Sequence, residues 1–262
     1  MKTRLDAELV RRGLARSREA ATDLIAAGNV LVGGMPASKA ASQVDAETSI
    51  TLKDDHAEFV SRGGHKLAGA LDKFTQIDVS GKTTLDAGAS TGGFTDVLLK
   101  RGAKKVVAVD VGYGQLAWEL QKDERVKILD RVNVRNLTPA QVGEEIDLVV
   151  ADLSFISLKL VLPALISVAK EGADFLVMVK PQFEVGKEKL GAGGVVRDVH
   201  LRKEAVIAVA DAAFALTLGT LGVVASPLPG PSGNVEYFLW LRKGAPALLE
   251  VDLDLAIEKG PA

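Results

Sequence analysis

The sequence predicts an α/β protein whose central sheet is mostly parallel, preceded by a small α+β domain. Two observations support this fold class. From Gly63 onward, short apolar runs of strand character alternate with helical stretches, the order expected of a parallel sheet with helices on both faces. Residues 1–54 instead hold two short helical segments and then strand and turn signals. We therefore predict a first domain at 1–54, a linker at 55–62 and a second domain at 63–262.

In the first domain, residues 4–13 place leucine and valine at helical spacing. Ser17 can cap a second helix over 18–27, because its hydroxyl can accept a hydrogen bond from a free amide of the first turn. Strand signals follow at 30–32 and 49–52. The domain is thus predicted to be a helix pair followed by a small sheet.

Basic residues are concentrated at the start of the chain, although the whole chain has a net charge of −2. Such a chain can bind nucleic acid only through a local patch, because most of that affinity comes from neutralising phosphates. The first 18 residues could form a solvated helix face. Alternatively, the turn between the helices could gather arginines into a clamp for RNA phosphates. The basic residues are Lys2, Arg4, Arg11, Arg12, Arg16 and Arg18.

Three segments of this domain resemble the S4 RNA-binding domain, which is named after a protein of the small ribosomal subunit. They are Arg4-Leu-Asp, Arg16-Ser-Arg-Glu-Ala and Gly28-Asn-Val-Leu-Val-Gly-Gly. The resemblance covers most of the first 54 residues and favours RNA binding over a solvated face. The RNA-binding residues it implies are Arg4, Arg11, Arg12, Arg16 and Arg18, with Arg62 as a further contact.

Seven strands are predicted in the second domain. Helical stretches such as 94–101 and 115–121 separate the first five, which should therefore run parallel. A turn rich in proline and glycine separates the last two, which can pair as an antiparallel edge. The apolar stretch 205–225 is interpreted as a buried helix followed by a strand, not as a membrane span. The strands are predicted at 83–87, 105–110, 126–129, 146–151, 175–180, 221–225 and 236–241.

The composition excludes several classes of protein and site. Without cysteine, the chain has no disulfide framework, no thiolate metal site and no cysteine nucleophile. Its N-terminus has no apolar core of a secretory signal, so we expect a cytoplasmic protein. The three histidines lack the spacing of metal ligands, and we expect no metal. They are His56, His65 and His200.

A glycine-rich turn after the first strand of the second domain predicts a ligand site. In an open α/β sheet this turn lies at the crevice where ligands bind, and glycines let the backbone approach them. A dinucleotide fingerprint would need glycine where Ser90 stands, and a P-loop would need lysine. The turn instead suits the amino-acid end of S-adenosyl-L-methionine. The residues assigned to this cofactor are Asp86, Gly88, Ala89, Ser90, Thr91, Gly92, Gly93 and Phe94.

Other strand ends complete the predicted cofactor site. Asp110 ends the second strand 22 residues after Gly88, and an acidic residue about 20 positions on commonly binds ribose hydroxyls. The third strand ends in the run Ile128-Leu-Asp130-Arg131-Val-Asn133, which could border the adenine; Asp130 and Arg131 are assigned to the cofactor. Asp152, after the fourth strand, would face the methyl site.

Four charged residues are predicted to converge at the carboxyl edge of this sheet: Lys66, Asp152, Lys180 and Glu236. Asp152 and Lys180 directly follow apolar strands, where a charge is costly unless it is paired or used. Methyl transfer from a sulfonium to a ribose 2′-oxygen needs orientation and a base, and a free lysine is mostly protonated at neutral pH. We assign Lys180 as general base, Lys66 as its cationic neighbour, and the two acids as orienting groups.

The order Lys-Asp-Lys-Glu, together with the glycine turn, resembles the FtsJ-like ribose 2′-O-methyltransferases. With the S4-like N-terminus, the chain is similar to the TlyA family. This resemblance implies a Rossmann-like class I methyltransferase domain that methylates cytidine riboses in small- and large-subunit ribosomal RNA. The partners would be ribosomal RNA or ribosomal subunits, and the oligomeric state stays open. The matching segments are Ser61-Arg-Gly-Gly-His-Lys66, Ala151-Asp-Leu-Ser-Phe-Ile-Ser157, Lys180-Pro-Gln-Phe-Glu184 and Gly193-Gly-Val-Val-Arg-Asp198.

Other functions were weighed against this one. The complete set of four charged residues argues against an RNA-binding protein with an inactive methyltransferase fold. A methyltransferase acting on a base or a protein is a third alternative. The missing cysteine and the poor amino-methylase motif at 152–155 argue against methylation of a base. The family's older haemolysin label would imply membrane damage, which the composition does not support. Phe155 could stack on a base or lie in the core, and the loop 186–197 could be a flap over RNA or a plain loop.

Overall fold

The computed structural model describes residues 3–33, 35–45, 48–52, 58–230 and 232–260. The chain forms two compact units, Met1–Glu58 and Phe59–Ala262. Phe59 is buried in an apolar cluster of the second unit. Part of the predicted linker lies outside the described residues, as do two other residues named in the sequence analysis. These are 55–57, including His56, together with Lys2 and Gly34.

The first unit combines a helix pair with two small antiparallel sheets. Both predicted helices are confirmed: α1 spans Leu5–Arg11 and α2 spans Arg18–Ala26. The Oγ of Ser17 accepts a hydrogen bond from the amide of Ala20 at 3.1 Å, which confirms the predicted cap. An apolar cluster holds the unit together, formed by Leu5, Leu9, Ala21, Ile25, Val30, Val44 and Ile50.

The strands of the first unit are short. β2 (Val30–Val32) lies between β3 (Met35–Pro36) and β5 (Ile50–Leu52), which confirms the two predicted strands. β1 (Thr3–Arg4) pairs with β4 (Gln43–Val44) in a second sheet. β1, β3 and β4 are too short to produce a periodic pattern in the sequence, so they are not predicted.

The second unit is built on one seven-stranded sheet with the order β11-β12-β10-β9-β6-β7-β8. The first five strands in sequence run parallel, and β12 is antiparallel to both of its neighbours. The predicted parallel sheet with a closing hairpin is thus confirmed. Within the hairpin β12 lies inside, against β10, so that β11 forms the edge. The strands are β6 (Thr83–Ala87), β7 (Lys105–Asp110), β8 (Val126–Asp130), β9 (Ile146–Ala151), β10 (Ala169–Val179), β11 (Leu218–Ala225) and β12 (Tyr237–Lys243).

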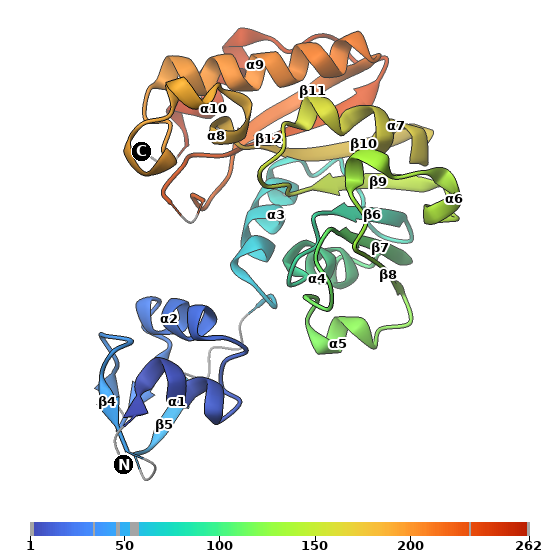
Figure 1. Ribbon diagram of the computed structural model, residues 1–262. Coiled ribbons are helices and arrows are strands. Elements are labelled where there is room, and N and C mark those ends of the chain that lie inside the picture. Colours follow the sequence, from blue (N-terminus) through green and yellow to red (C-terminus); the bar gives the residue numbers. More distant parts are fainter. Residues whose placement is uncertain (1–2, 34, 46–47, 53–57, 231, 261–262) are drawn as a thin grey trace. The chain divides into compact units, whose positions relative to one another are not determined.

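Helices cover both faces of this sheet (Figure 1). Residues of α3, α4 and α5 pack in one apolar cluster, and residues of α6, α7, α9 and α10 pack in the other. The α-helices are α3 (Arg62–Lys73), α4 (Gly93–Lys100), α5 (Trp118–Gln121), α6 (Pro139–Val142), α7 (Leu162–Val168), α8 (Pro181–Glu184), α9 (Val199–Ala215) and α10 (Glu250–Glu258). The described residues also form the 3-10 turns η1 (Val134–Asn136), η2 (Leu158–Leu160), η3 (Lys187–Lys189) and η4 (Ala192–Gly194).

The helix predictions differ from the structure in two places. α3 is not predicted, because Gly63 and Gly64 weaken its helical pattern. The predicted helix at 115–121 forms only over its last four residues, as α5. The amide of Ala117 donates to the carbonyl of Thr91 at 3.1 Å, so the preceding residues follow the glycine turn instead of a helix.

The apolar stretch 205–225 is a helix followed by a strand, as predicted. α9 extends upstream to Val199 and is capped by Asp198, whose Oδ1 accepts from the amide of His200 at 2.8 Å. β11 follows it. Within the described ranges, no helix has both the length and the apolar character needed to cross a membrane.

Sheet order places a crevice beside β6. β6 has β7 on one side and β9 on the other, so the connections that leave its neighbours run in opposite directions. Loops therefore diverge above the carboxyl ends of β6 and β9, the usual ligand position in open α/β sheets.

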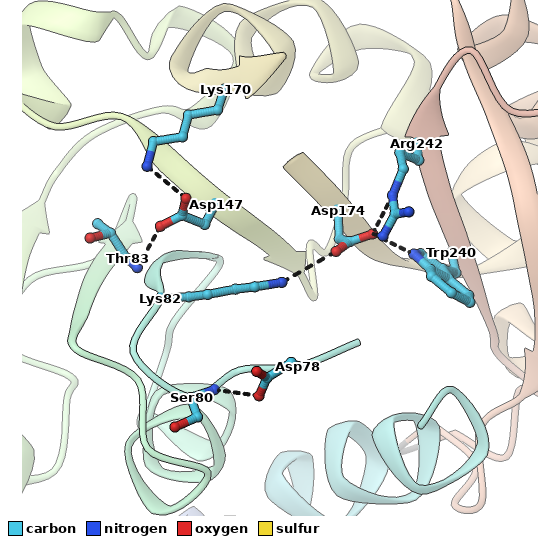
Figure 2. Close-up of polar contacts among 9 residues, drawn as sticks. All are labelled: Asp78, Ser80, Lys82, Thr83, Asp147, Lys170, Asp174, Trp240 and Arg242. Carbon is cyan, nitrogen blue, oxygen red and sulfur yellow. Dashed lines mark hydrogen bonds and ion pairs between the residues drawn. The ribbon is translucent and has the colours of Figure 1, made fainter. Parts of the chain in front are cut away.

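The opposite, amino edge of the sheet carries a polar network. Asp174, on β10, is 3% exposed and lies between Lys82 on one side and Trp240 and Arg242 on the other (Figure 2). Its Oδ1 accepts from Trp240 Nε1 at 2.8 Å and from the Arg242 guanidinium at 2.6 and 2.9 Å. Lys82 Nζ is 3.4 Å from the other oxygen. Asp174 therefore ties β12 and the segment before β6 to β10.

Asp174→Asn is expected to lower the free energy of unfolding of the second unit by about 2 kcal/mol, since an amide cannot neutralise Arg242 or accept all these bonds. Urea unfolding followed by tryptophan fluorescence measures it, because Trp118 and Trp240 are the only tryptophans of the chain and both lie in this unit. Glu171→Gln is the control, because that carboxylate is 85% exposed in its pair with Lys243. Equal losses in the two variants would contradict the prediction.

Candidate functional site

The glycine turn after β6 is held directly against the end of β9. The amide of Asp152 donates to the carbonyl of Ala87 at 3.0 Å. Gly88 has φ +88°, and a Cβ there would lie 2.5 Å from the carbonyl oxygen of Asp152. Only glycine fits this position, and the close approach of the two strand ends brings the turn and Asp152 to one place.

The next two glycines serve packing at the start of α4. Gly92 has φ +97°, and a Cβ there would overlap the side chains of Leu116 and Leu120. A Cβ on Gly93 would overlap Ser61 Oγ at the start of α3. These glycines let α3, α4 and the segment before α5 meet around the turn.

Two adjoining cavities open at this turn within the described residues. The first has a volume of about 230 Å³ and the second about 380 Å³, and both border Gly88, Ser90, Asp152 and Ser154. Because they share these residues, the cavities form one continuous site. Further residues of the first are Ser61, Arg62, Gly63, Lys66, Ala89, Thr91, Gly93, Phe94, Lys180 and Pro229. Further residues of the second are Asp110, Val111, Gln115, Asn133, Val134, Leu153, Phe155, Ile156 and Val161.

Asp110 faces the second cavity with both oxygens held by backbone amides. Oδ2 accepts from the amide of Ser90 at 2.8 Å, and Oδ1 accepts from the amide of Gly112 at 2.7 Å. These bonds join the ends of β6 and β7 and fix the carboxylate at the cavity wall. The second lone pair of each oxygen stays available for a ligand hydroxyl.

Four of the residues predicted to bind the cofactor line neither cavity. Gly92 packs against α5 as described above. Asp130 Oδ2 accepts from the amide of Gly114 at 2.9 Å, and the guanidinium of Arg131 lies 4.4 Å from the ring centre of Tyr113. The fourth is Asp86. Asp130 and Arg131 thus order the 111–114 loop instead of bordering the cavity.

Asp86 is fully buried below the turn. Its Oδ2 accepts from Thr95 Oγ1 at 2.7 Å, while Oδ1 has no hydrogen-bond partner among the described residues. Burial raises the pKa of Asp86 to about 7, and the nearby carboxylates of Asp152 and Asp110 add to this rise, whereas the Thr95 hydrogen bond opposes it. Asp86 therefore anchors α4 beneath the turn and lines neither cavity.

The second cavity is also lined by residues outside the set assigned to the cofactor. Val111 and Gln115 follow β7, and Asn133 and Val134 follow β8. Asn133 ends the 128–133 run that the sequence analysis places beside the adenine, three positions beyond Asp130. No local pattern in the sequence marks Leu153, Ile156 and Val161 as cavity residues, because apolar residues at such positions usually lie in the core.

The four charged residues predicted to converge form two close pairs. Lys66 Nζ donates to Glu236 Oε2 at 2.6 Å, with the two side chains 8% and 1% exposed. Lys180 Nζ is 2.5 Å from Asp152 Oδ1, an ion pair without the angles of a hydrogen bond, and donates to Ser154 Oγ at 3.0 Å. Lys66, Asp152 and Lys180 line the first cavity. Glu236 lies behind Lys66, where Gln182 Nε2 approaches it at 3.5 Å.

This arrangement places two amines at a cavity that adjoins the glycine turn. Each amine is held by an acid from another part of the chain, so the lysine side chains have little freedom. A hydroxyl group entering the first cavity would meet Lys180, Lys66 and Ser154 together. The site can therefore orient a hydroxyl through hydrogen bonds.

In the first unit, four of the predicted arginines pair with two buried carboxylates. Arg4 and Arg18 bind Asp6 at 3.0 and 2.9 Å. Arg11 and Arg12 bind Glu8 at 2.5 and 2.7 Å. The hydrogen bonds from Arg4 hold the pKa of Asp6 well below its usual range, and those from Arg11 and Arg12 lower the pKa of Glu8 to about 2. The acids fix Arg4, Arg11 and Arg18 at the helix pair and leave about half or more of each side chain exposed. Arg12 is only 21% exposed, because its guanidinium also donates to the carbonyls of Thr48 and Asp45.

The remaining predicted RNA contacts are exposed. Arg16 lies between the helices, and among the described residues it takes part in no ion pair. Arg62 is exposed at the start of α3 and lines the first cavity. Among the predicted RNA contacts, Arg62 therefore lies in the second unit, at the first cavity.

Phe155 is exposed, not part of the core. It is 91% exposed, has φ +63°, borders the second cavity and packs against the ring of Phe183 with 5.1 Å between the ring centres. The loop 186–197 is anchored at its end: Asn234 Oδ1 accepts from the amide of Val196 at 2.9 Å, and Nδ2 donates to the carbonyl of Gly194 at 3.1 Å. Across the described ranges, no group of three acidic, histidine or cysteine side chains could hold a metal.

Comparison with known families gives two matches. Residues 59–243 match the FtsJ-like methyltransferase family, and residues 3–50 match the S4 domain. The second match covers the helix pair and its arginines, and the first covers the cavities and both lysine–acid pairs.

Known proteins are similar over nearly the full chain. The chain is 58% identical to the 16S/23S rRNA (cytidine-2'-O)-methyltransferase TlyA of Mycobacterium tuberculosis, over 99% of both chains. It is 42% identical to a candidate rRNA methyltransferase of Bacillus subtilis, YqxC, over 92% of this chain and 86% of the relative. A solved structure of a candidate hemolysin from Streptococcus thermophilus aligns with a TM-score of 0.80 and 36% identity, over 98% and 95% of the two chains.

Proposed function

This chain belongs to the FtsJ-like methyltransferases and, within them, to the TlyA family with its N-terminal S4 domain, and on that premise we propose that it methylates cytidine ribose in ribosomal RNA. The methyl acceptor is the 2′-oxygen, and the donor is S-adenosyl-L-methionine. The proposed substrates are the small- and large-subunit RNAs, after the name of the Mycobacterium tuberculosis relative. The proposed place of reaction is the cytoplasm, where ribosomal RNA is found.

The residues around the glycine turn fit this cofactor. Gly88 lets the turn lie directly against the backbone of Asp152 at the cavity wall. The Ser90 and Thr91 hydroxyls are available there for a carboxylate, whereas the amides of Gly88, Ala89 and Ser90 already donate within the chain. Asp110 presents a fixed carboxylate to the second cavity for ribose hydroxyls, and Val134 and Ile156 offer an apolar wall for a base. When bound, the cofactor supplies a methyl group activated on a sulfonium.

The lysine–acid pairs would prepare the acceptor. Lys180 and Ser154 hold the 2′-hydroxyl in the first cavity, and Lys180, in its amine form, takes the proton as the oxygen gains the methyl group. Asp152 fixes the Lys180 amine and adds negative charge beside the site of the cationic donor. Lys66, held by Glu236, places a positive charge near the oxygen as it loses its proton.

The observation that carries this function is the convergence of Lys66, Asp152 and Lys180 on one cavity that adjoins the glycine turn. A protein that only binds RNA has no need for buried amines next to a cavity at the glycine turn. Phe155 adds an exposed ring at the mouth of this site, where it can stack on an RNA base. The fixed arginines of the first unit would bind phosphates.

Methyl transfer from radiolabelled cofactor onto separated small- and large-subunit RNAs, and onto the assembled subunits, tests the function. Digestion to nucleosides should place the label on cytidine carrying a ribose methyl group. A label on a base, or on protein, would refute the proposal. The same experiment shows whether naked RNA or a subunit is the acceptor.

Asp110→Asn is expected to weaken cofactor binding by about 10- to 100-fold, because ribose hydroxyls lose a charged acceptor and the Ser90 amide loses part of its partner. Calorimetric titration of the cofactor measures the effect. The rate at saturating cofactor should fall far less, since Asp110 does not line the first cavity. Unchanged affinity would show that the ribose does not lie at Asp110.

A further inference from the structure

Glu184 is a buried carboxylate four positions after Lys180, at the end of α8. Its side chain is 1% exposed. Oε2 accepts from Ser157 Oγ at 2.5 Å, and Oε1 accepts from the amide of Leu158 at 2.7 Å. The nearest cation is Lys159, with 3.9 Å between Nζ and Oε2. Burying a carboxylate that is held mainly by neutral donors costs free energy. We therefore expect Glu184 to have a role beyond packing.

Glu184 joins the two segments that carry the second lysine–acid pair. Residues 152–158 follow β9, and residues 180–184 follow β10, its parallel neighbour. At the site itself the segments meet through the contacts of Lys180 with Asp152 and Ser154. At their other end they are joined by the two hydrogen bonds of Glu184. The six-residue stretch from Asp152 to Ser157 is therefore tied to the 180–184 segment at both ends.

The backbone between these ties is in a disfavoured conformation. Phe155 has φ +63°, in the left-handed region that large side chains rarely adopt. Such a conformation persists only where the surrounding contacts over-determine it. Without the ties at Ser157 and Leu158, the stretch would relax toward an ordinary conformation and carry Asp152 and Ser154 away from Lys180.

We propose that Glu184 is a positioning residue for methyl transfer: by holding Ser157 and Leu158 it fixes the 152–158 segment so that Asp152 and Ser154 meet Lys180. The inference rests on the proposed function for its activity readout. Glu184 lines neither cavity, so it would act only through the 152–158 segment.

Glu184→Ala removes both hydrogen bonds and should lower kcat by about 10- to 100-fold, the effect expected of small misplacements in an active site. The KM for RNA and the affinity for the cofactor should stay within about threefold of wild type, because Arg62, Ser90 and Asp110 are untouched. Glu184→Gln should recover most of the rate, since an amide can accept from Leu158 and donate to Ser157. Ser157→Ala, a milder change, should lower kcat in the same direction and tests the inference if Glu184→Ala does not fold.

The matched control is Asp174→Asn, which alters an equally buried carboxylate on the opposite edge of the sheet. It should lose stability yet keep kcat within about twofold of wild type below its unfolding temperature. Equal losses of kcat in Glu184→Ala and Asp174→Asn would overturn the inference, because both would then reflect the lower stability of the second unit as a whole. So would a Glu184→Gln variant as slow as Glu184→Ala, or a Glu184→Ala variant with the wild-type kcat.

Hydrogen exchange of the Leu158 amide tests its hydrogen bond to Glu184 without an activity measurement. Exchange should be faster in Glu184→Ala than in wild type, and unchanged in Asp174→Asn. Unaltered protection of Leu158 would overturn the inference. If wild type transfers no methyl group to ribosomal RNA while Leu158 loses protection in Glu184→Ala, the proposed function fails and the tie between the two segments stands.

Discussion

Lys180→Ala is expected to lower the rate of methyl transfer by about 100- to 10,000-fold, the contribution usual for a general base. The amine lies 2.5 Å from Asp152 and 3.0 Å from Ser154, at the wall of the first cavity. Its loss removes the proton acceptor and leaves Asp152 free to move. Single-turnover transfer of labelled methyl groups onto ribosomal RNA measures the rate directly.

Cofactor affinity should change little in Lys180→Ala, since the residue does not line the second cavity. Lys180→Arg separates charge from base function: a guanidinium keeps the ion pair with Asp152 but does not deprotonate in proteins, so this variant should be as slow as alanine. Lys170→Ala is the matched control, because Lys170 forms an ion pair with Asp147 at the opposite edge. An active arginine variant would show that Lys180 supplies charge only.

Lys66→Met is expected to cost about 3–5 kcal/mol of stability in the second unit, because it leaves the Glu236 carboxylate buried without its partner. Glu236 is 1% exposed, and Gln182 approaches its other oxygen at only 3.5 Å. Urea unfolding followed by tryptophan fluorescence measures the loss. Methyl transfer should also fall sharply, since a positive charge beside the acceptor oxygen is lost.

The double variant Lys66→Met/Glu236→Gln distinguishes these two effects. Replacing the unpaired acid by an amide removes the buried charge, so most of the stability should return. Activity should not return, because the amine is still absent. Recovery of methyl transfer with stability would mean that the Lys66–Glu236 pair is only structural.

Much of the site could be predicted because the signals are local. The turn at 88–94 is recognisable from its glycines, and Asp152 and Lys180 from their position directly after apolar strands. Since β9 and β10 are parallel neighbours, their carboxyl ends meet at one edge, which brings these two residues to 2.5 Å. Asp86 is less easily placed from the sequence: strand alternation does not tell which charged residue lines a cavity and which lies beneath the turn.

By itself, the sequence determined the seven strands of the second domain, the helix pair of the first, the division into two domains as an expectation, and the chemical groups available at strand ends. Periodicity, glycine content and capping residues encode these properties within a few positions of the chain. The tertiary structure alone decided the partners. Lys66 meets Glu236 across 170 positions because β12 inserts between β10 and β11, and Asp130 turns to Gly114 because the loop after β7 folds back over β8. Such pairings depend on strand order and register, which no single stretch of sequence contains.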